Sequence, residues 1–369
     1  MSDTAVESGT CKNCSLPWTL VILLVLGIGV YAAYASGWFG PKLKIAIVTS
    51  GDTPYWDRVA QGAKQAADEL DVELTIVRPK TDADAQSQEI QRLIDSGKWD
   101  GIAISPISLT RQTVLFGRVA AKTTVVTMDS DLPVSRRLCF VGTDNYAAGR
   151  EMAEQIRQAI PDGGEVIVSI GQPDKENTLR RRQGLIDDLC DRSREPLRPF
   201  DPLDKPVSGS KYTIVTTIAD ESDPAKAIEL AAEAIRKHPN LKCFAGMLSY
   251  SAPALVAAVE KEKASGRVTV IGFDVSDETL ALIEQGKVAS TTMQDQFGLG
   301  YNSVRILVDN ARHNIGGLPM YQQHSLSSET VTRQNVALAR RRLAGEPVSL
   351  AAGSPTTGLS ANPGTTEGD

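Results

Sequence analysis

The chain has 369 residues, 23% of them charged, and a formal net charge of −6 at pH 7. This length exceeds what one hydrophobic core usually supports, so we expect two domains. The acidic balance argues against nucleic acid as a partner, because binding a phosphate backbone requires a concentrated basic surface. The dense basic runs at residues 180–182 and 340–342 are typical of solvated helix faces.

The first 41 residues contain an apolar segment that predicts export to the periplasm. Residues 16–39 carry no charge, and residues 20–34 are almost wholly apolar. Such a segment suits either a signal peptide or an anchor in the inner membrane. Ala33-Tyr34-Ala35 before Ser36 has the small-x-small form of a cleavage site, whereas the weakly charged leader of fifteen residues ahead of the segment is typical of an anchor. Both alternatives stay open.

The rest of the chain alternates short apolar strands with amphipathic helices. This alternation predicts an α/β fold of parallel sheets with helices on both faces. The strands form two sets, before and after about Gly142, which fits the two expected domains. The expected strands cover residues 43–49, 74–77, 101–104, 124–128, 165–170, 212–218, 243–247 and 268–273. Residues 191–210 are predicted to form a surface insertion, and residues 341–369 a disordered tail.

The segment after the first expected strand is typical of a binding loop. Tyr55 and Trp56 lie just beyond the carboxyl end of that strand, close to Asp52, and Pro54 begins a helix there. Ligands of parallel sheets bind at this edge. Exposed aromatic rings beside short polar groups suit a sugar, because its C–H faces stack on rings while its hydroxyls need hydrogen bonds. The alternative is that the aromatic pair is a packed corner of the core.

Polar side chains also stand where other apolar strands stop. These strand-end residues include Asp129, Ser130, Asp274 and Gln294. Carboxylates in such positions accept hydrogen bonds from neighbouring hydroxyls, and an amide both donates and accepts, which together suit a polyol. Asp144 stands in a similar position, but it precedes an expected helix, so we interpret it as an N-cap.

The sequence does not indicate an enzyme. Its three histidines, His238, His313 and His324, lie away from the strand-end residues, and it has no G-x-S-x-G motif or metal-ligand pair. Asp129 and Asp274 could serve as the paired carboxylates of a glycosidase, but the neighbouring aromatic pair fits binding better. We therefore predict no catalytic residue, no cofactor and no metal.

In this order and spacing, the motifs resemble the ribose-type periplasmic sugar-binding proteins. The resemblance covers about residues 43–335. The segments that carry it are Pro54-Tyr55-Trp56, residues 125–129, residues 141–150, Asn177 with Arg181 and Gly184, residues 270–274, and Gln294 ahead of Gly300-Tyr301. It implies two Rossmann-like lobes, joined by three hinge strands, that close on a monosaccharide and deliver it to an ABC importer.

The resemblance also implies the lobe boundaries. The first lobe would comprise residues 42–143 and 295–323, and the second residues 144–294 and 324–340. Hinge strands would lie near Thr143, Gln294 and Gln323. We expect a monomer.

Carried over residue by residue, the resemblance implies that Tyr55 and Trp56 stack on one face of the sugar. Asp129 and Asp274 would bind its hydroxyls. Further candidates for ligand binding are Gln294 as the hinge glutamine, Arg181, Asp52, Ser130, Asn177, Tyr250 and Ser251. The ribose binders of the family carry arginine at the position of Ser130 and asparagine at that of Met247, so the identity of the sugar stays open.

Two functions of different classes follow from these observations. The first is a solute receptor for an ABC sugar importer. The second is a membrane-tethered sensor subunit that signals to a partner without transport. The same fold also occurs in transcription repressors with a helix-turn-helix domain ahead of it, but this chain has an apolar segment there instead.

Overall fold

The computed structural model describes residues 18–35 and 41–345. It divides the chain into two units, Met1–Leu43 and Lys44–Asp369. The first unit contains α1 (Trp18–Ala35), a helix of 18 residues. Within the described ranges, no helix has the combination of length and hydropathy that crossing a membrane requires. The predicted cleavage site before Ser36 extends outside the described residues.

The second unit contains two sheets. The strands of sheet 1 are β1 (Lys44–Val48), β2 (Glu73–Val77), β3 (Gly101–Ile104), β4 (Thr124–Met128), β5 (Cys139–Thr143) and β12 (Gln323–Leu326). Those of sheet 2 are β6 (Gly164–Ile170), β7 (Val207–Ser208), β8 (Tyr212–Ala219), β9 (Leu241–Gly246), β10 (Thr269–Phe273), β11 (Ser290–Gln294) and β13 (Ser328–Val331). We name the parts of the unit built around these sheets lobe 1 and lobe 2.

The sheets are parallel except at the edges of sheet 2. The strand order is β12-β5-β4-β3-β1-β2 in sheet 1 and β13-β11-β10-β9-β6-β8-β7 in sheet 2. β13 pairs antiparallel with β11, and β7 antiparallel with β8. This arrangement confirms the predicted α/β fold with parallel sheets.

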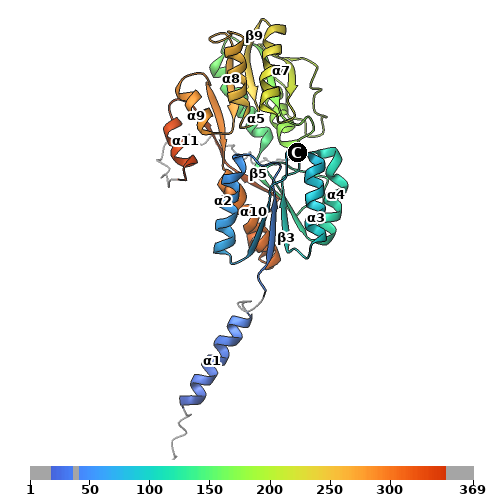
Figure 1. Ribbon diagram of the computed structural model, residues 1–369, viewed down its shortest axis with the longest axis vertical. Helices are drawn as coiled ribbons and strands as arrows, with labels where there is room; N and C mark the ends of the chain where they lie inside the picture. The colour runs from blue at the N-terminus through green and yellow to red at the C-terminus, as the bar shows by residue number, and fades with distance from the viewer. Residues whose placement is uncertain (1–17, 36–40, 346–369) are drawn as a thin grey trace, which may run out of the picture. The chain divides into compact units, whose positions relative to one another are not determined.

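Helices cover both faces of each sheet, because the central strands are apolar on both sides. The helices of lobe 1 are α2 (Tyr55–Glu69), α3 (Ala83–Asp95), α4 (Leu109–Lys122) and α10 (Gln296–Ala311), which the short η1 (Ile315–Gly317) follows. The helices of lobe 2 are α5 (Asn145–Ala159), α6 (Glu176–Leu189), α7 (Pro224–Lys237), α8 (Ser251–Lys261), α9 (Asp277–Glu284) and α11 (Val336–Leu343). In Figure 1, α2 and α10 lie on one side of sheet 1, and α3 and α4 on the other.

Glycines allow the helix pairs next to the sheets to approach closely. A Cβ atom at Gly300 of α10 would lie 1.9 Å from the carbonyl oxygen of Val59 in α2. In lobe 2, a Cβ atom at Gly149 of α5 would lie 1.9 Å from the carbonyl oxygen of Arg181 in α6. Each lobe therefore fixes one helix pair through backbone contact.

We expect Gly300→Ala to lower the free energy of unfolding by about 1–3 kcal/mol, because the new methyl group forces the two helix backbones apart. The matched control is Gly117→Ala in α4, where no atom lies within 4 Å of the added Cβ. There, alanine should stabilise the helix by roughly 0.5–1 kcal/mol. Urea denaturation of both variants measures the difference, and a similar effect at the two sites would contradict the close packing.

The chain crosses between the lobes at three places within residues 41–345: from β5 to α5, from β11 to α10 and from β12 to β13. The third crossing comes later than predicted. β12 pairs in parallel with β5, so residues 324–326 belong to lobe 1 and not to lobe 2. β12 contains no apolar run that would predict its bounds, because it is an edge strand whose residues are only exposed or partly buried.

One further boundary needs correction. The predicted tail from residue 341 begins too early, because residues 341–343 still belong to α11. This helix is held by packing against α9, which sequence periodicity does not reveal over so short a segment. Residues 346–369 lie outside the described part of the chain.

Candidate ligand-binding cleft

A cleft of about 710 Å³ lies between the two lobes, at the carboxyl ends of their parallel strands. Segments that follow β1 and β4 of lobe 1 and β6, β9 and β10 of lobe 2 contribute to its lining. Seven of the predicted site residues line it: Tyr55, Trp56, Asp129, Asn177, Arg181, Tyr250 and Asp274. Ligands of open parallel sheets bind in such a position.

The carboxylate of Asp129 accepts hydrogen bonds from residues of both lobes. One carboxylate oxygen lies 3.3 Å from the donating hydroxyl of Tyr55, and the other accepts hydrogen bonds from Ser105 Oγ at 2.9 Å and Asn177 Nδ2 at 3.2 Å. Asn177 belongs to lobe 2, whereas the other two donors belong to lobe 1. The backbone of Asp129 has a φ of 62°, which few residues other than glycine adopt. Such strain is common at binding sites.

Lys175 is a cleft residue that the sequence reasoning missed. Its Nζ donates to Ser50 Oγ at 2.7 Å and lies 3.4 Å from Asp129 Oδ2. It reaches from lobe 2 into lobe 1, and 12% of its side chain is exposed. A lone lysine five positions after a strand gives no sequence signal. Ser105, in contrast, directly follows β3, so the strand-end criterion should have found it.

Asp274 is the second carboxylate of the cleft and follows β10 in lobe 2. Its φ is positive, at 67°, like that of Asp129. Gln294 Nε2 donates to Asp274 Oδ1 at 2.8 Å. Arg181 Nη2 in turn donates to Gln294 Oε1 at 3.3 Å. Gln294 does not line the cleft, so it bonds to Asp274 on the side that faces away from the cleft.

Arg181 is almost completely buried and bonds to several parts of lobe 2. Its Nε donates to Asn145 Oδ1 and its Nη1 to the carbonyl oxygen of Met247, both at 2.8 Å. Its guanidinium carbon lies 3.7 Å from the centre of the Phe273 ring. Asn145 and Gln294 each stand at a crossing between the lobes. Arg181 therefore joins the floor of the cleft to two crossings.

The interpretation of residues 180–182 as a solvated helix face is wrong for two of the three arginines. Arg181 and Arg182 are each 1% exposed. Arg182 donates to Thr217 Oγ1 at 2.6 Å and to the carbonyl oxygen of Asp201 at 2.7 Å. These acceptors are far away in the sequence, so the basic run alone could not show that they satisfy buried guanidinium groups.

Burial raises the pKa of Asp274 to about 6, although Arg181 and Gln294 act in the opposite direction. Burial, together with the charges of Asp129 and Asp274, also raises the pKa of the Tyr55 hydroxyl well above its ordinary value. The tyrosine is therefore neutral at pH 7 and remains a hydrogen-bond donor. The cleft thus holds two carboxylates that are close enough to influence each other, next to a donor that does not titrate.

The aromatic pair meets edge to face. The ring centres of Tyr55 and Trp56 are 5.0 Å apart, and the ring planes are at 85° to each other. Both rings line the cleft, although Trp56 is only 4% exposed. Because the planes are nearly perpendicular, only one ring can lie flat on a given face of a sugar. The other would present its edge.

Tyr250 lies in the part of the cleft formed by lobe 2, where residues 220–223 offer no aromatic ring. Its hydroxyl donates to Asp220, whose other contacts include the backbone N–H of Ser222 at 2.8 Å. Burial raises the pKa of Asp220 to about 6. Tyr250 is thus held by a buried carboxyl group at the cleft wall.

Three of the weaker candidates do not line the cleft. Asp52 is largely exposed and forms an ion pair with Arg78 at 2.5 Å. Ser130 is buried, and its Oγ accepts the backbone N–H of Asn177 at 3.4 Å. Ser251 is fully buried, and its Oγ has no partner among the described residues.

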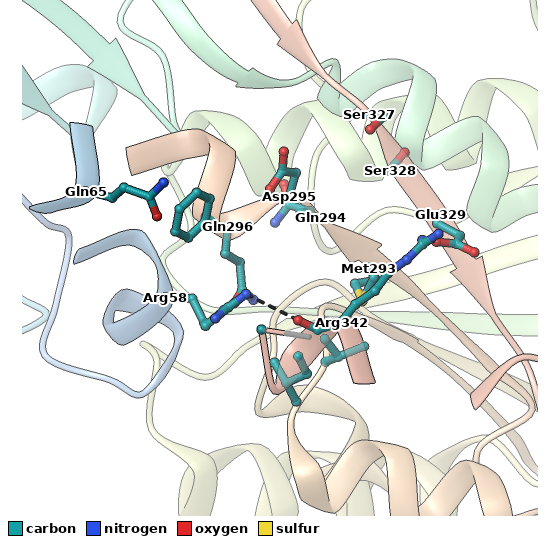
Figure 2. A pocket seen from close by; sticks show the side chains of 14 residues that line it. Arg58, Gln65, Met293, Gln294, Asp295, Gln296, Ser327, Ser328, Glu329 and Arg342 are labelled. Carbon is teal, nitrogen blue, oxygen red and sulfur yellow. Dashed lines mark hydrogen bonds and ion pairs between the residues drawn. The ribbon is translucent and has the colours of Figure 1, made fainter. Parts of the chain in front are cut away.

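Several hydrogen bonds besides those to Asp129 join the two lobes, and two of these contacts involve Asp174 and Arg58. Thr110 Oγ1 donates to Asp174 Oδ2 at 2.9 Å, and Ser108 Oγ donates to the same oxygen. Near the crossings, Arg58 Nη2 of α2 donates to the carbonyl oxygen of Arg342 in α11 at 3.2 Å, the dashed line in Figure 2. This second contact borders a separate cavity of about 540 Å³, which residues 294–296 and 327–328 help to line.

Residues 45–315 match the model of a family described as a periplasmic binding protein domain. The chain belongs to this family. The predicted resemblance is therefore confirmed. Because the family consists of solute-binding proteins, the prediction that the chain is not an enzyme is confirmed as well.

Relatives within this family bind sugars. The chain is 24% identical over 266 residues to the D-allose-binding periplasmic protein of Escherichia coli (strain K12), covering 69% of this chain and 80% of the relative. It is 22% identical over 249 residues to the ribose import binding protein RbsB of Bacillus subtilis (strain 168), covering 67% and 74%. An ABC transporter solute-binding protein of Burkholderia graminis C4D1M, solved in complex with D-arabinose, is 27% identical and has a TM-score of 0.70 over 80% of this chain and 96% of that one.

Proposed function

We propose that this protein is an exported receptor that closes on a monosaccharide or related small polyol and delivers it to an ABC importer. The observation that carries the proposal is the meeting of Asp129 from lobe 1 and Asp274 from lobe 2 in one cleft with an aromatic pair. Carboxylates and stacking rings are the groups that bind the hydroxyls and the C–H faces of a sugar. The sugar-binding relatives support the same conclusion.

In this proposal, Asp129 and Asp274 accept hydrogen bonds from sugar hydroxyls. Trp56 supplies stacking area. Asn177 and Lys175 already bond to Asp129, so they would also donate to hydroxyls next to it. Arg181 and Gln294 hold Asp274 in place and give the buried carboxylate partial compensation for its lost hydration.

A thermal-shift screen of pentoses, hexoses and polyols tests the proposal. At least one compound should raise the melting temperature, because a ligand at a hundredfold excess over its Kd stabilises the native state by about 2.7 kcal/mol. For a protein of this size, that corresponds to a rise of roughly 4 °C. A complete screen without any shift would refute sugar binding.

We further propose that the protein acts in the periplasm as a monomer. The segment of residues 16–39 directs export and is then either removed or kept as an inner-membrane anchor. Mass spectrometry of the native N-terminus distinguishes the two, because cleavage after Ala35 would leave Ser36 as the first residue. A protein recovered only from the cytoplasm would contradict export.

A further inference from the structure

We propose that the natural ligand is a sugar with an apolar substituent, as in an aryl or alkyl glycoside. This inference rests on the proposed function, because the sugar ring must occupy the polar part of the cleft next to Asp129 and Asp274. It specifies the class of ligand beyond a free monosaccharide.

One wall of the cleft is apolar, and lobe 2 supplies all of it. We name it the apolar wall; it consists of Pro224, Ile228, Leu248, Pro253, Ala257 and Leu343. Pro224 and Ile228 are four residues apart in α7, and Pro253 and Ala257 four residues apart in α8, so each pair shares a helix face. α7 and α8 pack against each other, and Figure 1 shows them side by side. The parts of the wall that α7 and α8 supply are therefore continuous.

A free monosaccharide does not match this wall. Its hydroxyls surround the ring, and each hydroxyl that is buried without a hydrogen-bond partner lowers the affinity by roughly one to two orders of magnitude. None of the six side chains of the apolar wall can donate or accept a hydrogen bond. The carboxylates of Asp129 and Asp274 and the amide of Asn177 line the cleft as well, so they are available to a sugar ring. The cleft therefore offers hydrogen-bonding groups to a sugar ring and, in lobe 2, an apolar surface to a substituent.

The volume of the cleft supports the same conclusion. Its roughly 710 Å³ falls within the range of about 300–1,000 Å³ that drug-sized ligands fill, and a monosaccharide is smaller than these. The volume does not reflect widely separated lobes, because Arg58 and Asp174 each already bond across to the other lobe. Space for a substituent therefore remains in an arrangement in which the lobes touch.

The terminal helix completes the apolar wall. Leu343 is the last residue of α11, and the bond from Arg58 to the carbonyl oxygen of Arg342 ties this end of the helix to lobe 1. Leu343 is only partly buried, and so are Ile228 and Leu248. Their remaining exposed apolar surface is available to a ligand. Each CH₂ group buried there would raise the affinity about fourfold.

Calorimetry on the full chain tests this inference with the pentoses and hexoses of the thermal screen and with both anomers of their methyl and phenyl glycosides. We expect one phenyl glycoside to bind at least tenfold more tightly than its parent sugar, with the methyl glycoside between them. If a parent sugar binds and neither phenyl anomer binds more tightly, the inference is wrong while the proposed function stands. If neither the sugars nor the glycosides bind, both are wrong.

Variants of the apolar wall provide a second readout. Ile228→Ala should lower the ratio of phenyl-glycoside affinity to parent-sugar affinity at least threefold, because it removes three carbon atoms from the wall. Ala257→Asp, at a partly buried position of α8, should lower the same ratio by at least tenfold. The matched control is Val114→Ala on α4, outside the cleft and 76% exposed, which should leave the ratio unchanged. An unchanged ratio in both wall variants would overturn the inference.

Discussion

Asp274→Asn should weaken sugar binding at least a hundredfold and yet make the unliganded protein more stable at pH 7. The loss of binding follows from the chemistry of the group. A carboxylate offers two charged acceptor oxygens, whereas an amide keeps one neutral acceptor, and Gln294 already occupies Oδ1 at 2.8 Å. Calorimetry with the sugar that gives the largest thermal shift measures the change in Kd.

The gain in stability follows from the raised pKa of Asp274, which is about 6 against an ordinary value of 3.8. Between these two pH values the folded state binds more protons than the unfolded state, so stability falls as the pH rises from about 4 to about 6. Asparagine stays neutral, so the free energy of unfolding of the variant does not fall in this way as the pH rises. The variant should therefore be more stable by roughly 1–3 kcal/mol at pH 7, and the difference should shrink towards zero at pH 4.

The control for both effects is Asp277→Asn, at the edge of the same cleft. Its side chain is 87% exposed and lies 3.5 Å from Arg340. A surface ion pair of this kind contributes little, so stability should change by less than about 0.5 kcal/mol at either pH. If Asp274→Asn binds sugar with normal affinity, the assignment of Asp274 as a ligand-binding residue is wrong.

The second large effect should come from Arg181→Ala, which we expect to lower the free energy of unfolding by about 3–5 kcal/mol. The substitution leaves three buried acceptors without their donor: Asn145 Oδ1, Gln294 Oε1 and the carbonyl oxygen of Met247. Each unsatisfied group costs about 1–3 kcal/mol, and a cavity remains beside Phe273. Urea denaturation measures the loss.

Two further variants separate the geometry of Arg181 from its charge. Arg181→Lys keeps the charge but cannot reach all three acceptors from one ammonium group, so it should restore only part of the stability. Arg118→Ala, at an exposed position of α4, should change the stability by less than about 0.5 kcal/mol. A loss below about 1 kcal/mol for Arg181→Ala would show that Arg181 does not hold the crossings together.

The strand-end criterion located the centre of the cleft because it rests on topology. Asp129 and Asp274 both follow central strands of parallel sheets, and the ends of these strands face the cleft. The criterion fails for groups whose role depends on distant partners. Lys175 bonds to Ser50, which lies 125 positions away, and no local pattern shows such a pairing.

Other features depend on packing that the local sequence does not encode. Arg181 was a candidate through family resemblance alone, since a run of three arginines indicates an exposed surface until its buried acceptors are known. β12 was expected only through the resemblance, as a hinge strand near Gln323, and α11 was not predicted, both for a related reason. β12 is a short edge strand without an apolar run, and α11 is a short helix that packs against α9.

The central claim is that a sugar draws the two lobes together. Opening must break the cross-lobe bonds of Asp129, Asp174 and Arg58, and a ligand that touches Asp129 and Asp274 at once would oppose opening. Small-angle X-ray scattering of residues 42–345, which include α11, measures this directly. We predict that the radius of gyration falls when the sugar from the thermal screen is added at saturation. An unchanged radius would contradict a hinged receptor and would favour a rigid carbohydrate-binding module.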